Sequence, residues 1–305
     1  MRLKVTRILL MGLTILISIG AFFGGIMMLI KPDGSLLGMT DMLPYFHPLP
    51  FSDTLFQDYT FAGIMLIIVN GITNLIAFLF LCFRKKAGHV LGTLFGVTLM
   101  AWISIQFSIF PINAMDIIFF LLGLLQFIVG YISLVSYCQE HFHVLPSDYP
   151  NIQKDSETMV VYFSRKGYTK KLAYQLADEH RACIEELHTA ERTEGDLGYW
   201  WSGRFAMHRW RMKTEKVIIP QSVKKVILVT PIWVFHMSAP MWDFIMENQE
   251  VLKTKGVAIL FNHFNNALPS CARKEVESLL PVTEIYSVTT ILGYQTKRKT
   301  VKVTK

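Results

Sequence analysis

The stretch Met159–His180 reads MVVYFSRKGYTKKLAYQLADEH. It begins with a continuous apolar run, Met159–Ser164, which is typical of a strand buried in a parallel sheet. A turn containing Gly167 follows, and apolar residues then recur at the spacing of an amphipathic helix. Strand, tight turn and helix in this order predict one unit of a doubly wound α/β fold.

The same alternation continues toward the C-terminus. Helical patterns over Pro240–Leu252 and Pro269–Leu280 separate further short apolar runs. We therefore predict an α/β domain at residues 157–293, with a doubly wound parallel sheet of five strands and right-handed crossovers. The predicted strands are Met159–Ser164, Ala182–His188, Lys225–Thr230, Gly256–Phe261 and Glu284–Thr289.

The N-terminal half has a different composition. Residues 1–150 carry seven Lys/Arg and seven Asp/Glu, whereas the rest of the chain carries 23 and 16 and accounts for the whole net charge of +7. Four apolar stretches each exceed the roughly 20 residues needed to cross a bilayer. They predict an all-α, four-helix transmembrane domain at residues 1–144, followed by a polar linker at 145–156. The predicted spans are Ile8–Ile30, Tyr59–Phe83, His89–Phe110 and Ala114–Tyr137.

The loop charges predict the orientation of these spans. Basic residues precede the first span, and Arg84–Lys86 separate the second from the third, whereas the loop Lys31–Asp58 has one basic and four acidic residues. Because basic loops stay on the cytoplasmic side, we expect a multi-pass protein of the cell membrane with its N-terminus and C-terminal domain in the cytoplasm. Four cysteines without CxxC spacing agree with a reducing compartment.

Few polar residues interrupt the predicted spans, and Asn70, Asn74 and Gln126 are among them. They have two interpretations: hydrogen bonds between helices, or a polar lining for a quinone or another small ligand. The segment GIMMLIKPDGSLLGM, residues 25–39, and the Asn-containing second span resemble the small four-helix membrane proteins grouped as DoxX-like.

Three loops at the carboxyl ends of predicted strands are candidates for a ligand site, because ligands bind there in doubly wound sheets. The loop Ser164–Thr169 has hydroxyl residues at both ends, and Gly167 permits a positive φ. Backbone N–H groups and the helix dipole make such a turn an anion site. The alternative is an ordinary capped helix start.

The other two loops supply aromatic and amide side chains. Trp233 and Phe235 follow the third strand and are suited to stacking on a flat ring, although they could also pack beneath the loop. Asn262, His263 and Phe264 follow the fourth strand and offer polar groups and a second stacking face. Asn-rich turns also occur without a ligand.

Together, VVYFSRKGYT and TPIWVFHMSAPMWDFI resemble the two flavin loops of flavodoxins of the Pro-x-Trp type. The resemblance spans residues 157–293 and implies noncovalently bound FMN. Compared with that family, the Thr-Gly-Asn-Thr core is replaced by Lys-Gly-Tyr-Thr, the second loop lacks glycines, and no room remains for the last helix. The FMN-binding residues that it implies are Ser164, Arg165, Lys166, Gly167, Tyr168, Thr169, Pro231, Ile232, Trp233, Asn262, His263 and Phe264.

Two basic segments lie outside these loops. Glu194–Lys216 is aromatic and basic, and a helix there would place Arg204, His208 and Arg211 on one side. It is interpreted either as a helix on lipid headgroups or as a landing site for an anionic substrate or electron partner. The basic tail, 294–305, receives the lipid interpretation. No nucleic-acid motif accompanies the charge, so nucleic acid is not an expected partner.

The sequence thus predicts a membrane-anchored, flavodoxin-like FMN protein, an oxidoreductase or electron carrier that transfers electrons at the cytoplasmic face. Its donor and acceptor are not identified. One alternative is a flavodoxin-like domain without cofactor that serves interaction or sensing. Another is a flavin-dependent quinone reductase that uses the helix bundle. Either a partner subunit in a homodimer or the membrane half would cover the sheet face that lacks a helix.

Overall fold

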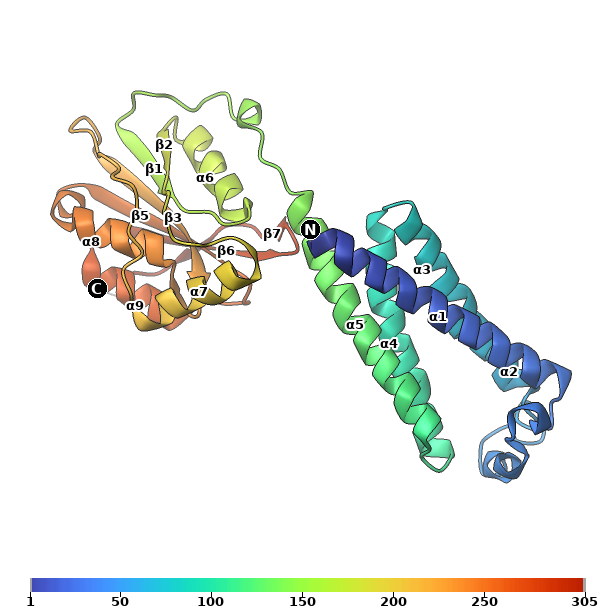
Figure 1. The fold of residues 1–305 in the computed structure, drawn as a ribbon. Helices are drawn as coiled ribbons and strands as arrows, with labels where there is room; N and C mark the ends of the chain where they lie inside the picture. Colours follow the sequence, from blue (N-terminus) through green and yellow to red (C-terminus); the bar gives the residue numbers. More distant parts are fainter. Residues whose placement is uncertain (1, 304–305) are drawn as a thin grey trace. The chain divides into compact units, whose positions relative to one another are not determined.

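The protein folds into two compact units, Met1–Glu140 and His141–Lys305. The structure, a computed structural model, describes residues 2–303. The first unit is helical and the second is built around a β-sheet, and Figure 1 shows them in blue to green and in green to red. The predicted combination of a helical N-terminal part with an α/β C-terminal part is confirmed.

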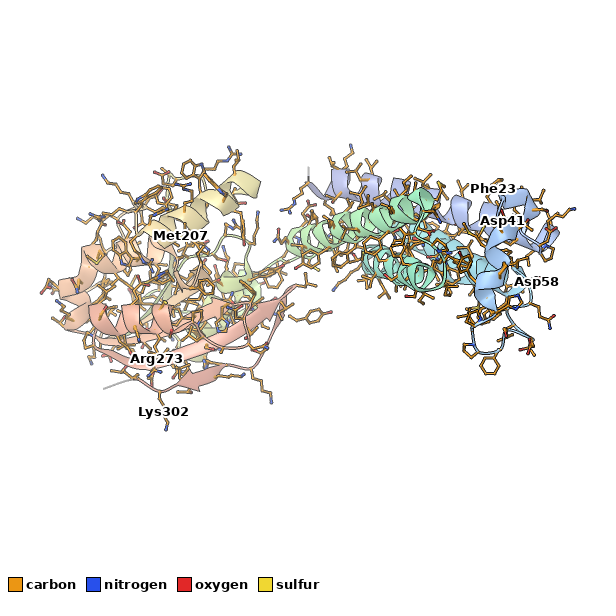
Figure 2. The ribbon with its side chains drawn as sticks, turned by 90° about the horizontal axis from the view of Figure 1, so that it is seen from below. Phe23, Asp41, Asp58, Met207, Arg273 and Lys302 are labelled. Atoms are coloured by element: carbon orange, nitrogen blue, oxygen red, sulfur yellow. The ribbon has the colours of Figure 1, made fainter. Side chains whose placement is uncertain are left out.

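The N-terminal unit contains four helices that are long and apolar enough to cross a membrane, as predicted. Leu16, Phe23 and Leu121 are among the large apolar side chains exposed on them, and Phe23 is labelled in Figure 2. Exposed apolar surface of this extent suits contact with lipid. The helices are α1 (Arg2–Ile30), a second formed by α2 (Thr60–Leu66), a π-helical segment (Ile67–Ile72) and α3 (Thr73–Cys82), then α4 (Lys86–Ile109) and α5 (Ala114–Glu140).

Glycines allow α4 and α5 to approach each other closely. A Cβ atom at Gly96 would lie 2.6 Å from the backbone nitrogen of Phe127 and 2.8 Å from the carbonyl oxygen of Gly123. At Gly130 it would lie 2.8 Å from the Cα atom of Thr93. Since these neighbours are backbone atoms, they cannot move aside as the end of a side chain can. Small residues are therefore required where the two helices touch.

We expect Gly96→Ala to destabilise the N-terminal unit by about 1–3 kcal/mol, the usual cost of an extra methyl group in a packed interface. Gly20→Ala is the matched control, because a Cβ atom there would have nothing within 4 Å. Thermal unfolding in mild detergent measures the difference. Equal melting temperatures for the two variants would contradict the close α4–α5 contact.

Polar side chains connect the helices inside this unit. Gln126 on α5 donates through Nε2 to Oδ1 of Asn74 on α3 and to the carbonyl oxygen of Gly92 on α4, both at 2.9 Å. These bonds support the interpretation of Asn74 and Gln126 as links between helices. Asn70, in the π-helical segment, is buried, and its side-chain amide has no hydrogen-bond partner among the described residues.

The C-terminal unit has an eight-stranded sheet. Five strands run parallel in the order β2-β1-β3-β5-β6, so the strand order reverses between β1 and β3. The predicted number of five strands is wrong, because three short antiparallel strands make the sheet mixed. The strands are β1 (Thr158–Tyr162), β2 (Cys183–Glu186), β3 (Lys225–Trp233), β4 (His236–Met237), β5 (Gly256–His263), β6 (Val282–Ile291), β7 (Tyr294–Gln295) and β8 (Lys299–Val301).

Helices lie on both faces of the sheet (Figure 1). Successive residues of β3 alternate between two apolar cores: Val226 and Leu228 face one, and Ile227 and Val229 face the other. The first core contains side chains of two helices, whereas the second contains those of one helix only. The helices are α6 (Tyr168–Glu179) on the second core, α8 (Ala239–Lys253) and α9 (Ser270–Leu279) on the first, and α7 (Gly195–His208), which contacts β3, β4 and α8.

The C-terminal segment is not a free basic tail, since its described part forms β7 and β8 along β6. Arg298 makes two hydrogen bonds of 2.9 Å with the carboxylate of Glu179 on α6, and its guanidinium lies 5.0 Å from the centre of the Tyr286 ring. Gln295 donates to the carbonyl oxygen of Tyr168. The segment thus extends over the α6 side of the sheet, and a cavity of about 510 Å³ lies between it and α6.

Candidate functional site

The loop that follows β1 forms a tight turn before α6. Gly167 is the N-cap of α6 and has a φ of +85°, which a residue with a side chain rarely adopts. A Cβ atom there would lie 3.2 Å from the Phe142 ring. The N–H of Gly167 donates to Oγ of Ser164 at 3.1 Å, which closes the turn. The expected positive φ at Gly167 is confirmed.

Thr169 connects this loop to the end of β5. Its Oγ1 accepts a hydrogen bond of 3.1 Å from Nδ2 of Asn262, and Oδ1 of Asn262 accepts one of 2.6 Å from the hydroxyl of Thr290 on β6. Thr169 and Asn262 are both buried. Two of the three predicted loops therefore meet in one hydrogen-bonded chain at the carboxyl edge of the sheet.

This arrangement leaves hydrogen-bond donors for an anion. A hydroxyl group is one donor and two acceptors, and the protein uses an acceptor site on both Ser164 and Thr169. The first backbone N–H groups of α6 lack intrahelical acceptors by position, and the helix dipole places partial positive charge there. Two hydroxyl hydrogens and several N–H groups are therefore clustered around one turn.

The cationic side chains of the loop face other groups. Lys166 forms an ion pair of 2.6 Å with Glu194, and Lys170 forms one of 3.0 Å with Glu186. The guanidinium of Arg165 lies 4.8 Å from the centre of the Tyr199 ring. Hydroxyl and backbone groups, rather than these cations, are thus the donors best placed for an anion at the turn.

The residues predicted to follow the third strand belong to a hairpin. Pro231, Ile232 and Trp233 are the last residues of β3, and Trp233 pairs with His236 of β4. The two residues between them, Val234 and Phe235, have φ values of +46° and +67°. Non-glycine residues with such φ values carry a backbone strain of about 1–3 kcal/mol each. A positive φ is an outlier for a β-branched residue such as Val234.

Trp233 packs against Phe163, the residue that directly follows β1. Its ring meets the buried Phe163 ring edge to face, with centroids 5.4 Å apart and planes at 90°. Trp233 itself is half-buried, so part of the indole remains accessible. Phe235 at the hairpin turn and Phe264 after β5 are exposed. The aromatic side chains expected at this edge are therefore present, with Trp233 the most fixed of them.

An ion pair that the sequence did not reveal binds the backbone of the hairpin at Met237. Arg209, just after α7, pairs with Glu275 on α9, and its Nη1 donates to the carbonyl oxygen of Met237 at 3.3 Å. The N–H of Met237 donates to Oε2 of Glu275 at 3.4 Å. Burial raises the pKa of Glu275 and lowers the pKa of Arg209, while each partner opposes the shift of the other. The two residues are 66 positions apart, and no motif links them.

His263 turns toward the sheet. Its Nδ1 lies 2.9 Å from the carbonyl oxygen of Asn265, which only accepts, so Nδ1 must be the donor. Nε2 lies 3.1 Å from Oγ of Ser287 and accepts from it in the neutral ring. Both nitrogens are therefore bonded to protein groups. Burial lowers the pKa of His263, with Lys299 adding to the shift.

A pH dependence follows for His263. Because its folded-state pKa is lowered, the unfolded chain binds more protons below about pH 6.5, and stability should fall as the pH decreases toward 5. We expect His263→Gln to flatten this part of the stability profile, measured by urea unfolding of the full chain between pH 5 and 7. If the free energy of unfolding falls just as steeply with decreasing pH in the variant, a group other than His263 causes the pH dependence.

Among the described residues, no cluster of three His, Cys, Asp or Glu side chains is placed to hold a metal ion. The twelve predicted residues lie between the end of β1 and the start of α6, at the end of β3, and at or just after the end of β5. Direct bonds join the first and third groups through Thr169 and Asn262, and packing of Trp233 on Phe163 places the second beside the end of β1. The 510 Å³ cavity is lined by none of the twelve.

No protein-family model matches the chain, and no curated protein matches it. Among solved structures, it is similar in its C-terminal part to a flavoprotein in complex with FMN from Lactobacillus acidophilus, with 16% identity and a TM-score of 0.38, over 44% of this chain and 93% of that one. A Bacteroides eggerthii protein described as a flavoprotein is 20% identical, with a TM-score of 0.38, over 44% and 88%. A Bacteroides uniformis protein described in the same way is 19% identical, with a TM-score of 0.38, over 45% and 94%.

Proposed function

We propose that the protein is a membrane-anchored, FMN-binding electron-transfer protein of the flavodoxin type. The observation that supports this most directly is the turn before α6. Ser164 and Thr169 each accept a hydrogen bond from the protein. Each hydroxyl hydrogen can therefore be donated to a ligand, which favours an anion. The N–H groups at the start of α6 favour the same ligand, and a phosphate monoester fits this set of donors.

The site lies where doubly wound sheets bind ligands. The strand order reverses between β1 and β3, and the crevice at such a reversal is the usual ligand position in this architecture. A phosphate at Ser164–Thr169 would leave the flat part of the ligand near the ends of β3 and β5. Trp233 and Phe264 supply apolar ring faces there, which favour stacking with an aromatic ligand.

FMN would supply one- and two-electron transfer. The protein's own groups would bind and orient it: hydroxyl and N–H groups hold the phosphate, and aromatic rings shield one part of the flavin from water. The pattern of basic loops favours electron transfer at the cytoplasmic face. The four apolar helices would anchor the protein in the bilayer.

The visible absorption spectrum of the full chain, purified in mild detergent, tests this function. We expect flavin absorption bands, with FMN as the compound released on denaturation and identified by chromatography. If the protein is isolated without cofactor, added FMN should bind and should bind more tightly than riboflavin, which lacks the phosphate. A colourless protein that does not bind added FMN would contradict the proposal and favour an interaction or sensing domain.

A further inference from the structure

The helix α7 has an apolar outer face. Leu197, Trp200 and Met207 each expose more than half of their surface, and Met207 is labelled in Figure 2. Ser202 and Ala206 are buried on the opposite side of the helix, so α7 is seated on the unit by its small residues. Soluble α/β units normally expose charged residues at the outer positions of such a helix.

The aromatic residues on and just after α7 form one connected cluster with an arginine. The rings of Trp200 and Trp201 have centroids 5.0 Å apart, those of Trp201 and Phe205 6.3 Å, and those of Phe205 and Trp210 5.7 Å. The guanidinium of Arg204 lies 4.8 Å from the centre of the Trp200 ring and 5.6 Å from that of Trp210. Stacked in this way, the cation and the rings share one surface.

The charge of this segment has one sign. From Leu197 to Lys213 the sequence has no Asp or Glu. Carboxylates on α8 and α9 pair with Arg209 and Arg211, whereas Arg204 has no carboxylate partner among the described residues. Tryptophan and arginine without acidic neighbours are complementary to the headgroup region of an anionic bilayer, which accepts indole rings and attracts cations.

We propose that this surface, the α7 aromatic face, rests on an anionic lipid bilayer. Four apolar helices of the same chain keep the C-terminal unit within reach of a membrane, so the inference rests on the anchoring part of the proposed function but not on FMN. Lipid explains both features of the face: its apolar rings enter the interface, and its unpaired arginine binds lipid phosphates. The face consists of the exposed Leu197, Trp200, Trp201, Met207 and Trp210 together with the partly exposed Arg204.

Fluorescence of a label at position 207 tests the contact. Met207→Cys is combined with Cys82→Ser and Cys271→Ser, because these two native cysteines are exposed, and the full chain is placed in nanodiscs containing phosphatidylglycerol. We expect the emission of an environment-sensitive label to shift to shorter wavelength, to lose most of its quenching by iodide, and to be quenched by lipids with brominated acyl chains. Glu250→Cys on α8 is the control, since that side chain is 87% exposed and should stay accessible to iodide.

A second variant separates lipid contact from a disturbed fold. Adding Trp200→Ser and Trp201→Ser changes only exposed side chains, so the unit should melt as before while iodide quenching at position 207 returns. Full iodide access at 207 in chains incorporated into nanodiscs would overturn the inference. Protection that persists in detergent and grows with protein concentration would overturn it in favour of a second copy. Chains that fail to incorporate would overturn the membrane anchoring as well.

Discussion

Replacing both Ser164 and Thr169 by alanine should weaken FMN binding about a hundredfold or more. In the proposed site each hydroxyl would donate to the phosphate, and a hydrogen bond to a charged group contributes about 1.5–3 kcal/mol. Two such losses amount to at least two orders of magnitude in the dissociation constant. Fluorescence titration of the cofactor-free full chain with FMN measures the change.

Two comparisons make the result specific to the phosphate. Riboflavin has no phosphate, so its weaker affinity should be nearly the same in the double variant and in the original protein. Thr254→Ala with Ser278→Ala is the matched control, because both hydroxyls are exposed and bond only to local carbonyl oxygens. An unchanged FMN affinity in the Ser164 and Thr169 variant would show that the turn before α6 is not the phosphate site.

The parts of the fold that the sequence predicted are those with local signals. The parallel strands β1, β3 and β5 each contain an apolar run buried on both faces, so the sequence alone reveals them. The C-terminal segment was misjudged although its pairing partner β6 directly precedes it in the chain, because basic residues such as Lys299 and Lys302 indicated a lipid surface rather than a strand. Arg211 was expected on a helix with Arg204, but α7 ends at His208 and Arg211 pairs with Asp243 at 2.7 Å.

The candidate site shows the same division. The turn at Gly167 could be predicted from the local sequence, because glycine just before a helix readily adopts the positive φ seen there. The β3–β4 hairpin has none, since two-residue turns with positive φ normally contain Gly, Asn or Asp, and here they are Val234 and Phe235. The support from Arg209 and Glu275 depends on α7 and α9 meeting in space, which one sequence does not specify.

Removing Arg209 from its ion pair with Glu275 should have the largest effect on the stability of the C-terminal unit. In Arg209→Met, the partly buried carboxylate of Glu275 would lose its cation. Breaking a fully buried ion pair costs about 3–5 kcal/mol, which is the upper limit for this pair. Both partners are at most about a fifth exposed, with side chains 22% and 13% accessible. Urea unfolding of the C-terminal unit in the full chain at pH 7, followed by pulse proteolysis, measures the loss. Arg192→Met is the control, since Arg192 is exposed and outside the pair.

The pH dependence identifies the cause. Burial already raises the pKa of Glu275, and Arg209 opposes this shift, so removing the arginine should raise the pKa further. An acid with a raised folded-state pKa is destabilising above that pKa and ceases to be so as it gains a proton. Arg209→Met should therefore recover part of its lost stability between pH 7 and 5.

The double variant Arg209→Met, Glu275→Gln separates charge from shape. It leaves no buried charge, and it should be more stable than Arg209→Met alone at pH 7 while losing the recovery at lower pH. If the double variant is as unstable as the single one at every pH, the missing hydrogen bond to Met237 decides the effect instead. Either result bears on the cofactor, because Met237 belongs to the hairpin that positions Trp233. A hairpin held by the charge of Glu275 should loosen when a falling pH protonates this carboxylate, whereas a hairpin held by hydrogen bonds should not.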